Sequence, residues 1–275
     1  MPIPLPAIRI GTCGFSYPEW IKAGIYPKGT KSADMLGLYS LRFPVVELNY
    51  TWYQMPMPDS VARMSRRVGP GFQFSVKLTR TMTHEIDSDW RKHTVRFRQG
   101  IAPLIEAGQL ATVLIQLPPT FERTKDKRLH LAHLLNALEG LPLAVEFRHR
   151  SWAVDRVFAG LEQRRVSLVA VDTPPLAHLF PSLSVCTNPD LFYVRFHGRN
   201  EMGWRSGTMQ QKFNYDYSIN ELLEWAGDKI PTMAAGCKRG LLFFNNHVAG
   251  QAFRNGETMI ELLKQAERPE EVPVP

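Results

Sequence analysis

Cysteine is scarce in this sequence, and its scarcity argues against two kinds of site. Only three cysteines, Cys13, Cys186 and Cys237, occur among 275 residues, and no two of them form a CxxC pair. Zinc clusters and disulfide frameworks need closely spaced or numerous cysteines. The sequence therefore predicts neither, and it favours a reducing cytoplasm as the location.

Long apolar runs and nucleotide-binding motifs are missing as well. No segment approaches the roughly 20 apolar residues that span a bilayer, so no membrane association is expected. The opening MPIPLPAIRI has no basic head and no small-residue cleavage site, so we expect no secretory signal. The first predicted strand leads into GTCGF and not into GxGxxG, and no P-loop occurs. No motif requires a cofactor.

The formal charge of +7 favours anionic partners. The basic residues are dispersed, however, over two predicted helices at residues 59–68 and 90–107 and a third group at residues 123–128. A dispersed distribution is typical of solvated helix faces. A small anionic molecule is therefore the expected partner, and nucleic acid is the alternative.

Eight short β-branched or aromatic runs predict strands. Most are continuously apolar, which is typical of strands that are covered on both faces in a parallel sheet. They comprise residues 8–14, 44–50, 72–78, 111–119, 141–147, 166–172, 191–198 and 240–247.

Segments with helical periodicity separate these strands. Eight such strand–helix units predict a single (β/α)8 TIM-type barrel, for which about 250 residues is typical. The connection after the sixth strand, TPPLAHLFPSLSVCTN, contains too many prolines for a full helix and is expected to be irregular. One domain is predicted for residues 1–266, followed by an acidic, proline-rich tail at 267–275 that we expect to fray.

Polar residues end at least seven of the eight predicted strands. Strand side chains alternate between faces, so the polar set can point into the barrel at its C-terminal mouth, where barrel enzymes hold their active sites. We predict catalytic roles for Glu47, Lys77, Glu146 and Asp172. Substrate binding is predicted for Asn49, Tyr53, His84, Gln116, Arg148, Trp152, Arg195, His197, Asn245, Asn246 and His247.

The chemistry of this set leaves alternatives open. Glu47 and Glu146 can act as an acid/base pair, since two carboxylates in different environments can hold opposite protonation states; equally, each can pair with an arginine or lysine. Arg195, Arg199 and Arg205 lie in or beside a glycine-rich loop and can clamp a phosphate or carboxylate. Purely structural ion networks also occur in barrels, but so many polar strand ends favour a small-molecule site.

Seven blocks in order along the chain resemble the YecE-like family, also called domain of unknown function 72. They are IGTCGFSYPEW, VVELNYTWYQMP, FQFSVKLTRTMTH, LIQLPPTF, LAVEFRHRSW, FYVRFHG and FFNNHVAGQAFRNG, and they extend from Ile10 to Gly256. The resemblance implies a TIM-type barrel and no particular reaction.

Three hypotheses for function follow. The first is an enzyme, for instance a hydrolase, that acts on a small polar or anionic metabolite by acid/base chemistry at the mouth. The second is a non-catalytic protein that binds a metabolite or nucleic acid. The third is a hydrolase assisted by a divalent metal, with Glu146, Asp172, His197 and His247 as the ligand candidates; no ligand motif supports a metal, so none is assigned. The oligomeric state is not indicated.

Overall fold

Eight parallel strands form one sheet in the computed structural model, which describes residues 7–267. The sheet order is β1-β8-β7-β6-β5-β4-β3-β2, and a parallel bridge between Cys13 and Glu47 joins its two edge strands and closes the barrel. The strands are β1 (Ala7–Thr12), β2 (Val45–Leu48), β3 (Gln73–Lys77), β4 (Leu110–Gln116), β5 (Leu143–Glu146), β6 (Ser167–Asp172), β7 (Phe192–Phe196) and β8 (Arg239–Phe244). The predicted TIM-type barrel is confirmed.

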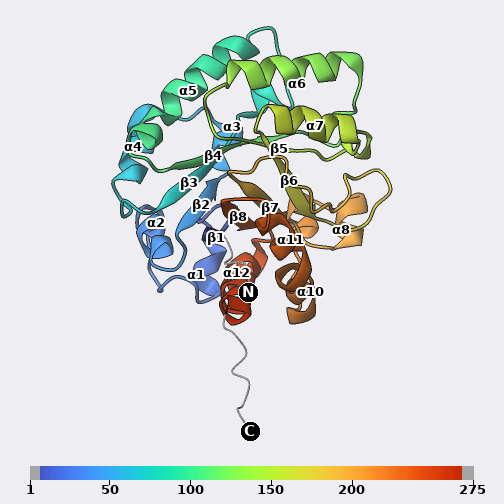
Figure 1. Ribbon diagram of the computed structural model, residues 1–275. Helices are drawn as coiled ribbons and strands as arrows, with labels where there is room; N and C mark the ends of the chain where they lie inside the picture. The colour runs from blue at the N-terminus through green and yellow to red at the C-terminus, as the bar shows by residue number, and fades with distance from the viewer. Residues whose placement is uncertain (1–6, 268–275) are drawn as a thin grey trace.

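Helices surround this sheet on its outer side (Figure 1). Every residue of β2, β5, β6 and β7 is buried, as expected for strands that have the barrel interior on one face and helices on the other. The outer helices are α2 (Ser32–Ser40), α4 (Pro58–Ser65), α5 (Trp90–Glu106), α6 (Lys125–Ala137), α7 (Asp155–Gln163), α10 (Ile219–Glu224), α11 (Ile230–Ala234) and α12 (Gln251–Glu267). A π-helical stretch, Trp225–Lys229, joins α10 to α11.

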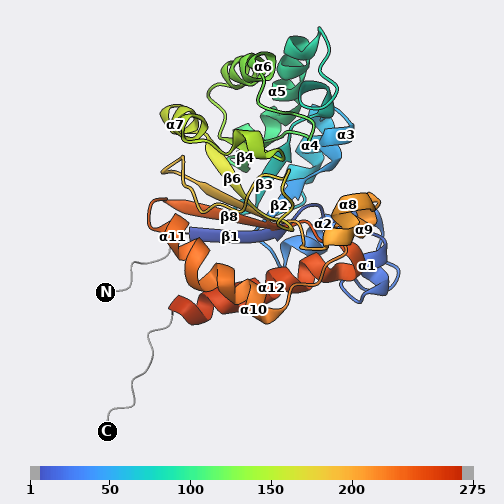
Figure 2. The same ribbon diagram turned by 90° about the vertical axis from the view of Figure 1, so that its right-hand side faces the viewer.

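Short helical turns that the periodicity did not indicate follow several strands. They are α1 (Glu19–Lys22), α3 (Tyr50–Tyr53), η1 (Arg80–Met82), η2 (Arg150–Trp152), α8 (Glu201–Ser206), α9 (Met209–Lys212) and η4 (Val248–Gly250). In Figure 2, α8 and α9 lie at the end of the barrel toward which β1 points. These turns therefore surround the C-terminal mouth.

The connection between β6 and β7 contains no helix, as predicted. It folds back across the end of β5, where Leu179 bridges His149 and the backbone N–H of Phe180 donates to the carbonyl of Arg148. This connection thereby fixes the backbone that follows Glu146.

Cys186 and Cys237 form a disulfide, which corrects the expectation that no cysteines would pair. The two residues are 51 positions apart, so their spacing gives no signal. They precede β7 and β8, which are neighbours in the sheet, and the fold therefore brings them together. The cytoplasmic location loses its argument from unpaired cysteines and stays a prediction.

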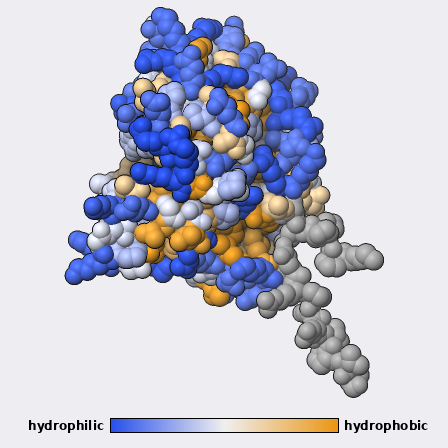
Figure 3. Space-filling model, turned by 90° about the vertical axis from the view of Figure 1, so that its left-hand side faces the viewer, coloured by the Kyte–Doolittle hydropathy of each residue, from blue (hydrophilic) through white to orange (hydrophobic). Residues whose placement is uncertain are grey.

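The surface is mixed in character. On the face shown in Figure 3, hydrophilic residues cover most of the upper part and hydrophobic residues gather lower down. Among residues 7–267, no helix is both long enough and apolar enough to cross a membrane. The predicted frayed tail, residues 267–275, lies outside the described residues except for Glu267, which ends α12.

Candidate functional site at the barrel mouth

A cavity of about 730 Å³ opens at the C-terminal mouth of the barrel. This volume lies within the range of about 300–1,000 Å³ that is usual for small-molecule sites. Its wall combines strand ends with the short turns around them: Gly14, Phe15, Ser16, Tyr17, Leu48, Asn49, Tyr50, Trp52, Tyr53, Lys77, His84, Gln116, Pro118, Pro119, Arg148, Arg195, Trp204, Met209, Lys212, Phe213, Asn245 and His247.

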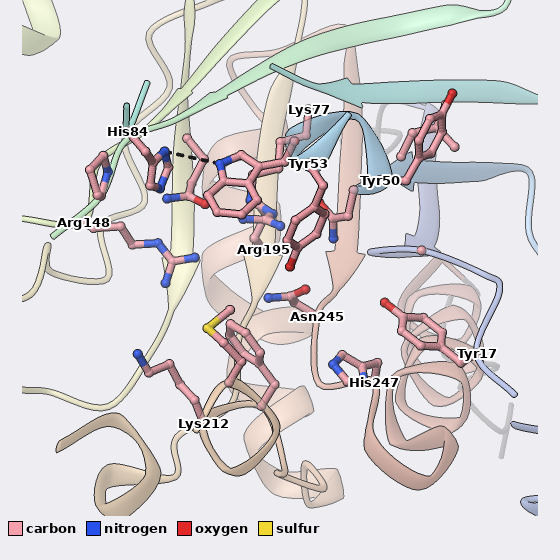
Figure 4. Close-up of a pocket in the computed structure, with 18 of the residues that line it drawn as sticks. Tyr17, Tyr50, Tyr53, Lys77, His84, Arg148, Arg195, Lys212, Asn245 and His247 are labelled. Atoms are coloured by element: carbon pink, nitrogen blue, oxygen red, sulfur yellow. Dashed lines mark hydrogen bonds between the residues drawn. The ribbon is translucent and has the colours of Figure 1, made fainter. Parts of the chain in front are cut away.

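The charged side chains of this wall all have one sign. Four lysine or arginine residues, Lys77, Arg148, Arg195 and Lys212, line the cavity, whereas no aspartate or glutamate of the described chain does. Figure 4 shows Arg148 and Lys212 on one side of the cavity and Lys77 on another. Ringed by cations and aromatic groups, the cavity suits an anionic ligand with a planar body.

Two of the three carboxylates predicted to be catalytic, Glu47 and Glu146, are completely buried beneath Arg195, which lines the floor of the cavity. Arg195 bridges them: one guanidinium nitrogen lies 2.6 Å from Glu47 Oε1 and the other lies 2.6 Å from Glu146 Oε2. Arg148 pairs with the second oxygen of Glu146, and Tyr193 donates its hydroxyl proton to Glu47. Each glutamate is therefore paired with at least one arginine, and Glu146 Oε1 contacts Arg148 without forming a hydrogen bond.

Arg148 and Arg195 stabilise the negatively charged form of Glu146. Burial by itself raises the pKa of a carboxyl group, but the guanidinium groups of Arg148 and Arg195 outweigh it and hold the pKa of Glu146 well below the usual value. A carboxylate held in this state cannot deliver a proton at neutral pH. The arrangement favours a role in positioning the two arginines.

His197 completes the layer under the floor. Its Nε2 lies 3.1 Å from a guanidinium nitrogen of Arg148, and its Nδ1 lies 3.0 Å from the amide nitrogen of Asn245. Burial, and then the nearby Arg148, lower the pKa of His197 to about 3. His197 is thus a neutral ring that orients Arg148 and Asn245, and it does not itself line the cavity.

Asp172 does not point into the barrel, and this part of the prediction is wrong. Its sheet partner is Phe196, whereas Val171 pairs with the inward-facing Arg195. Asp172 therefore points to the helix layer, where it accepts hydrogen bonds from Arg199, Tyr217 and Trp225. Its carboxylate is a buried anchor between β6 and the helices that follow β7.

Trp152 and Asn246 also lie away from the cavity, contrary to expectation. The indole of Trp152 stacks between Phe121 and Phe147, and its N–H donates to the carbonyl of Phe121. Asn246 donates to the backbone oxygen of Tyr215 and to the side chain of Asn255. Both side chains hold neighbouring loops in place.

Two arginines expected to clamp an anion are occupied elsewhere. Arg199 forms a bidentate contact with Asp172 and also reaches Glu224, and Arg205 pairs with Glu201 one turn earlier in α8. Of the three arginines in this region, Arg195 alone lines the cavity.

Nine residues predicted for the site do meet at the cavity: Asn49, Tyr53, Lys77, His84, Gln116, Arg148, Arg195, Asn245 and His247. Two of these are histidines whose pKa burial lowers. His84, whose pKa falls to about 4 through burial and the proximity of Lys77, accepts a hydrogen bond from Trp52 Nε1 at 3.3 Å (Figure 4). The ring of His247 stacks on Tyr17 at 4.7 Å. Both histidines are neutral at pH 7.

Sequence reasoning did not assign Tyr17, Lys212 or Phe213 to the site, although all three line it. Tyr17 follows the first strand closely and could have been found from that position. Lys212 and Phe213 lie well beyond the end of β7, and only the folding of α8 and α9 over the mouth brings them to the cavity.

Lys77 is the most exceptional residue of the wall. It ends β3, and its Nζ lies 5.2 Å from the centroid of the Trp52 ring. Burial, together with the positive charge of Arg195, lowers the pKa of Lys77 to about 7, although Glu47 and Glu146 act in the opposite direction. A substantial fraction of this amine is therefore uncharged at neutral pH.

Neither a metal centre nor a reactive thiol emerges from the predicted residues. Within residues 7–267, no group of three or more His, Cys, Asp or Glu side chains is placed to hold a metal ion. The orientation of Asp172 separates it from Glu146 and His197. Burial raises the pKa of the Cys13 thiol well above its usual value, so Cys13 is not poised as a nucleophile.

Comparisons with known proteins agree with this architecture. The profile of a family described as "Protein of unknown function DUF72" matches residues 9–275. The UPF0759 protein YunF of Bacillus subtilis (strain 168) is 30% identical over 254 residues, covering 87% of this chain and 90% of YunF. The UPF0759 protein YecE of Escherichia coli (strain K12) is 30% identical over 249 residues, covering 82% and 84%. The crystal structure of a DUF72 family protein from Thermotoga maritima superposes with a TM-score of 0.85 at 33% identity, covering 94% of this chain and 99% of that one.

Proposed function

The chain belongs to the DUF72 family, and from this premise we propose that its barrel mouth binds a small anionic molecule and acts on it chemically. One observation carries the proposal: among the described residues, four lysine or arginine side chains and no carboxylate line the cavity. Glu47 and Glu146 are paired with two of these cations, Arg195 and Arg148, so the positive excess of the wall comes from Lys212 and from the protonated fraction of Lys77.

The residues divide into three proposed roles. Arg148 and Lys212 bind the anionic group, since guanidinium and ammonium groups form charge-assisted hydrogen bonds with phosphate or carboxylate oxygens. Trp52, Tyr53 and Trp204 enclose the body of the ligand. Glu47 and Glu146, which lie below the cavity, hold Arg195 and Arg148 in place by ion pairs. This positioning role replaces the acid/base role predicted for the two glutamates.

Lys212 gives the clearest test of anion binding, because it lies on α9 and takes no part in the buried charge cluster. The probe is pyridoxine 5′-phosphate, an aromatic phosphate ester, and neutral pyridoxine is its matched control. We expect the ester to bind at least tenfold more tightly than pyridoxine. Changing Lys212→Gln should weaken its affinity by about tenfold, because one charge-assisted hydrogen bond contributes about 1.5 kcal/mol or more.

Isothermal titration calorimetry at two salt concentrations measures these affinities. Lys125→Gln, a change of an exposed lysine on α6, should leave the affinity unaltered. Equal affinity for the ester and for pyridoxine, or an unchanged affinity in the Lys212→Gln variant, would contradict the proposed anion site.

A further inference from the structure

We propose that the Nζ amine of Lys77 forms an imine with the carbonyl carbon of an anionic aldehyde or ketone held in the cavity. This inference rests on the proposed function, because the cationic wall is what brings such a carbonyl compound to the amine. Three features of Lys77 support the imine: the access of Nζ from the cavity, its lack of a carboxylate partner among the described residues, and the cations that surround it.

The amine is accessible from the cavity. Lys77 is the last residue of β3, and its side chain forms part of the cavity wall (Figure 4). Its Nζ faces the ring of Trp52 at 5.2 Å. Trp52 is itself fixed, because its indole N–H donates to His84, whose Nδ1 also lies 2.8 Å from the hydroxyl of Thr83. The amine therefore lies at the cavity wall against an aromatic ring that a hydrogen bond to His84 holds in place.

Within residues 7–267, no carboxylate forms an ion pair with the Lys77 side chain. Glu47 lies on the adjacent strand β2, where it would be the nearest candidate, but its two oxygens contact Arg195 and Tyr193. Glu146 is occupied by Arg195 and Arg148. Across the part of the chain that the structure describes, Lys77 forms no ion pair.

The electrostatic surroundings keep the amine nucleophilic. Burial, and after it the positive charges of Arg195 and Arg148, oppose its protonation and outweigh Glu47 and Glu146, which lowers the pKa of Lys77 to about 7. Only an unprotonated amine can attack a carbonyl carbon, and lysines are activated in this way by desolvation and by neighbouring cations. Arg195 and Arg148 thus have two effects: they contribute positive charge to the cavity wall, and they favour the uncharged form of the Lys77 amine.

Imine formation is balanced without any further reagent. The lone pair on Nζ forms a bond to the carbonyl carbon, and the π electrons of the C=O bond move to oxygen. The carbinolamine then loses its C–O bond as the C=N bond forms. Both hydrogens of the amine leave with the carbonyl oxygen as water. Protonation of the resulting imine gives an iminium, which withdraws electrons from the adjacent carbon.

The test uses pyridoxal 5′-phosphate, which differs from pyridoxine 5′-phosphate in having an aldehyde in place of an alcohol. The wild-type protein is incubated with it at pH 7, reduced with sodium borohydride and digested, and every modified lysine is quantified by peptide mass spectrometry. We expect Lys77 to react at least roughly tenfold faster than any other lysine, because an ordinary lysine with a pKa near 10.4 is almost fully protonated at this pH. Excess pyridoxine 5′-phosphate should protect Lys77.

Two comparisons distinguish the possible failures. The Lys77→Arg variant keeps the positive charge and should lose this adduct while the labelling of its other lysines is unchanged; if the variant does not fold, the wild-type peptide map and the protection experiment decide. Labelling spread over other lysines with none at Lys77, while pyridoxine 5′-phosphate still binds in a Lys212-dependent manner, would overturn the imine and leave the anion site intact. Absence of both binding and labelling would overturn both.

Discussion

Replacing Arg195 by methionine is expected to lower the melting temperature by roughly 6–20 °C. Arg195 is 1% exposed and is the ion-pair partner of both Glu47 and Glu146. Removing one member of a buried charge cluster costs about 3–5 kcal/mol, because the remaining charges are left without compensation. For a chain somewhat larger than 150–250 residues, each kcal/mol shifts the melting temperature by about 2–4 °C.

The loss of stability in the Arg195→Met variant should depend on pH. The pKa of Glu146 is depressed in the folded protein, so its contribution to stability is present above the ordinary value of 4.5 and is lost as the pH falls through the lower folded-state value. The Arg195→Met variant lacks one of the two arginines that lower the pKa of Glu146, so it loses less stability than the wild type as the pH falls. We therefore expect the difference in stability between wild type and variant to shrink in acid.

Thermal and urea denaturation at several pH values measure this effect. The matched control is Arg205→Met, which removes an exposed ion pair with Glu201 and should change stability by less than about 1 kcal/mol. If the two variants were equally stable at pH 7, the buried cluster of Glu47, Glu146 and Arg195 could not be what stabilises the barrel beneath the cavity.

Replacing Lys77 by methionine is expected to have the opposite effect and to stabilise the protein at pH 7. The amine has no ion-pair partner among the described residues, and burial penalises its charged form. Methionine is unbranched like lysine, is one heavy atom shorter, and carries no charge. Removing a group that is retained for function at the expense of stability commonly gains about 0.5–2 kcal/mol, or about 1–8 °C in melting temperature.

The pH dependence of this gain follows from the shift of the Lys77 pKa from 10.5 to about 7. Between these values the unfolded chain binds more protons than the folded one, so wild-type stability rises with pH. The advantage of Lys77→Met is therefore greatest at or below pH 7 and disappears near pH 10.5.

Lys92→Met, at an exposed lysine that pairs with Asp89, is the control for the loss of a lysine charge. Differential scanning calorimetry from pH 6 to pH 10 gives the comparison. A Lys77→Met variant that melts well below wild type at pH 7 would show that Lys77 is part of the packing and is not a functional group in a cationic cavity.

The sequence was most informative where its hydrophobic pattern was regular. Eight apolar runs predicted the strands, and the closed parallel barrel followed from their number and spacing. In β5 and β7, alternation placed Glu146, Arg148, Arg195 and His197 on the inner face, where the structure has them.

Alternation failed in β6. Ser167–Asp172 reads SLVAVD, and its uninterrupted small and apolar residues leave both faces equivalent. Only the register with β7 reveals that Val171 faces inward and Asp172 outward. The same limit applies to long-range partners, since no local pattern predicts that Cys186 meets Cys237 or that Lys212 reaches the mouth.

The sequence also could not distinguish a carboxylate that faces a ligand from one that supports an arginine. Glu47 and Glu146 lie on the correct strands and point inward, yet the side chain of Arg195 covers them from the cavity. Depth along the barrel axis depends on the stagger of neighbouring strands. This distinction decides the charge of the wall, and with it the class of ligand.

The measurement that tests the account most directly is the pKa of Lys77 itself. An NMR titration of the protein carrying isotope-labelled lysine, with the Lys77 signal assigned by its absence from the Lys77→Arg variant, yields this value. If Glu47 and Glu146 are paired with Arg195 and Arg148 and so form no ion pair with Lys77, Lys77 should titrate near pH 7. Titration near its ordinary value of 10.5 would mean that a carboxylate neutralises the amine, and it would contradict both the cationic cavity and the role given to Lys77.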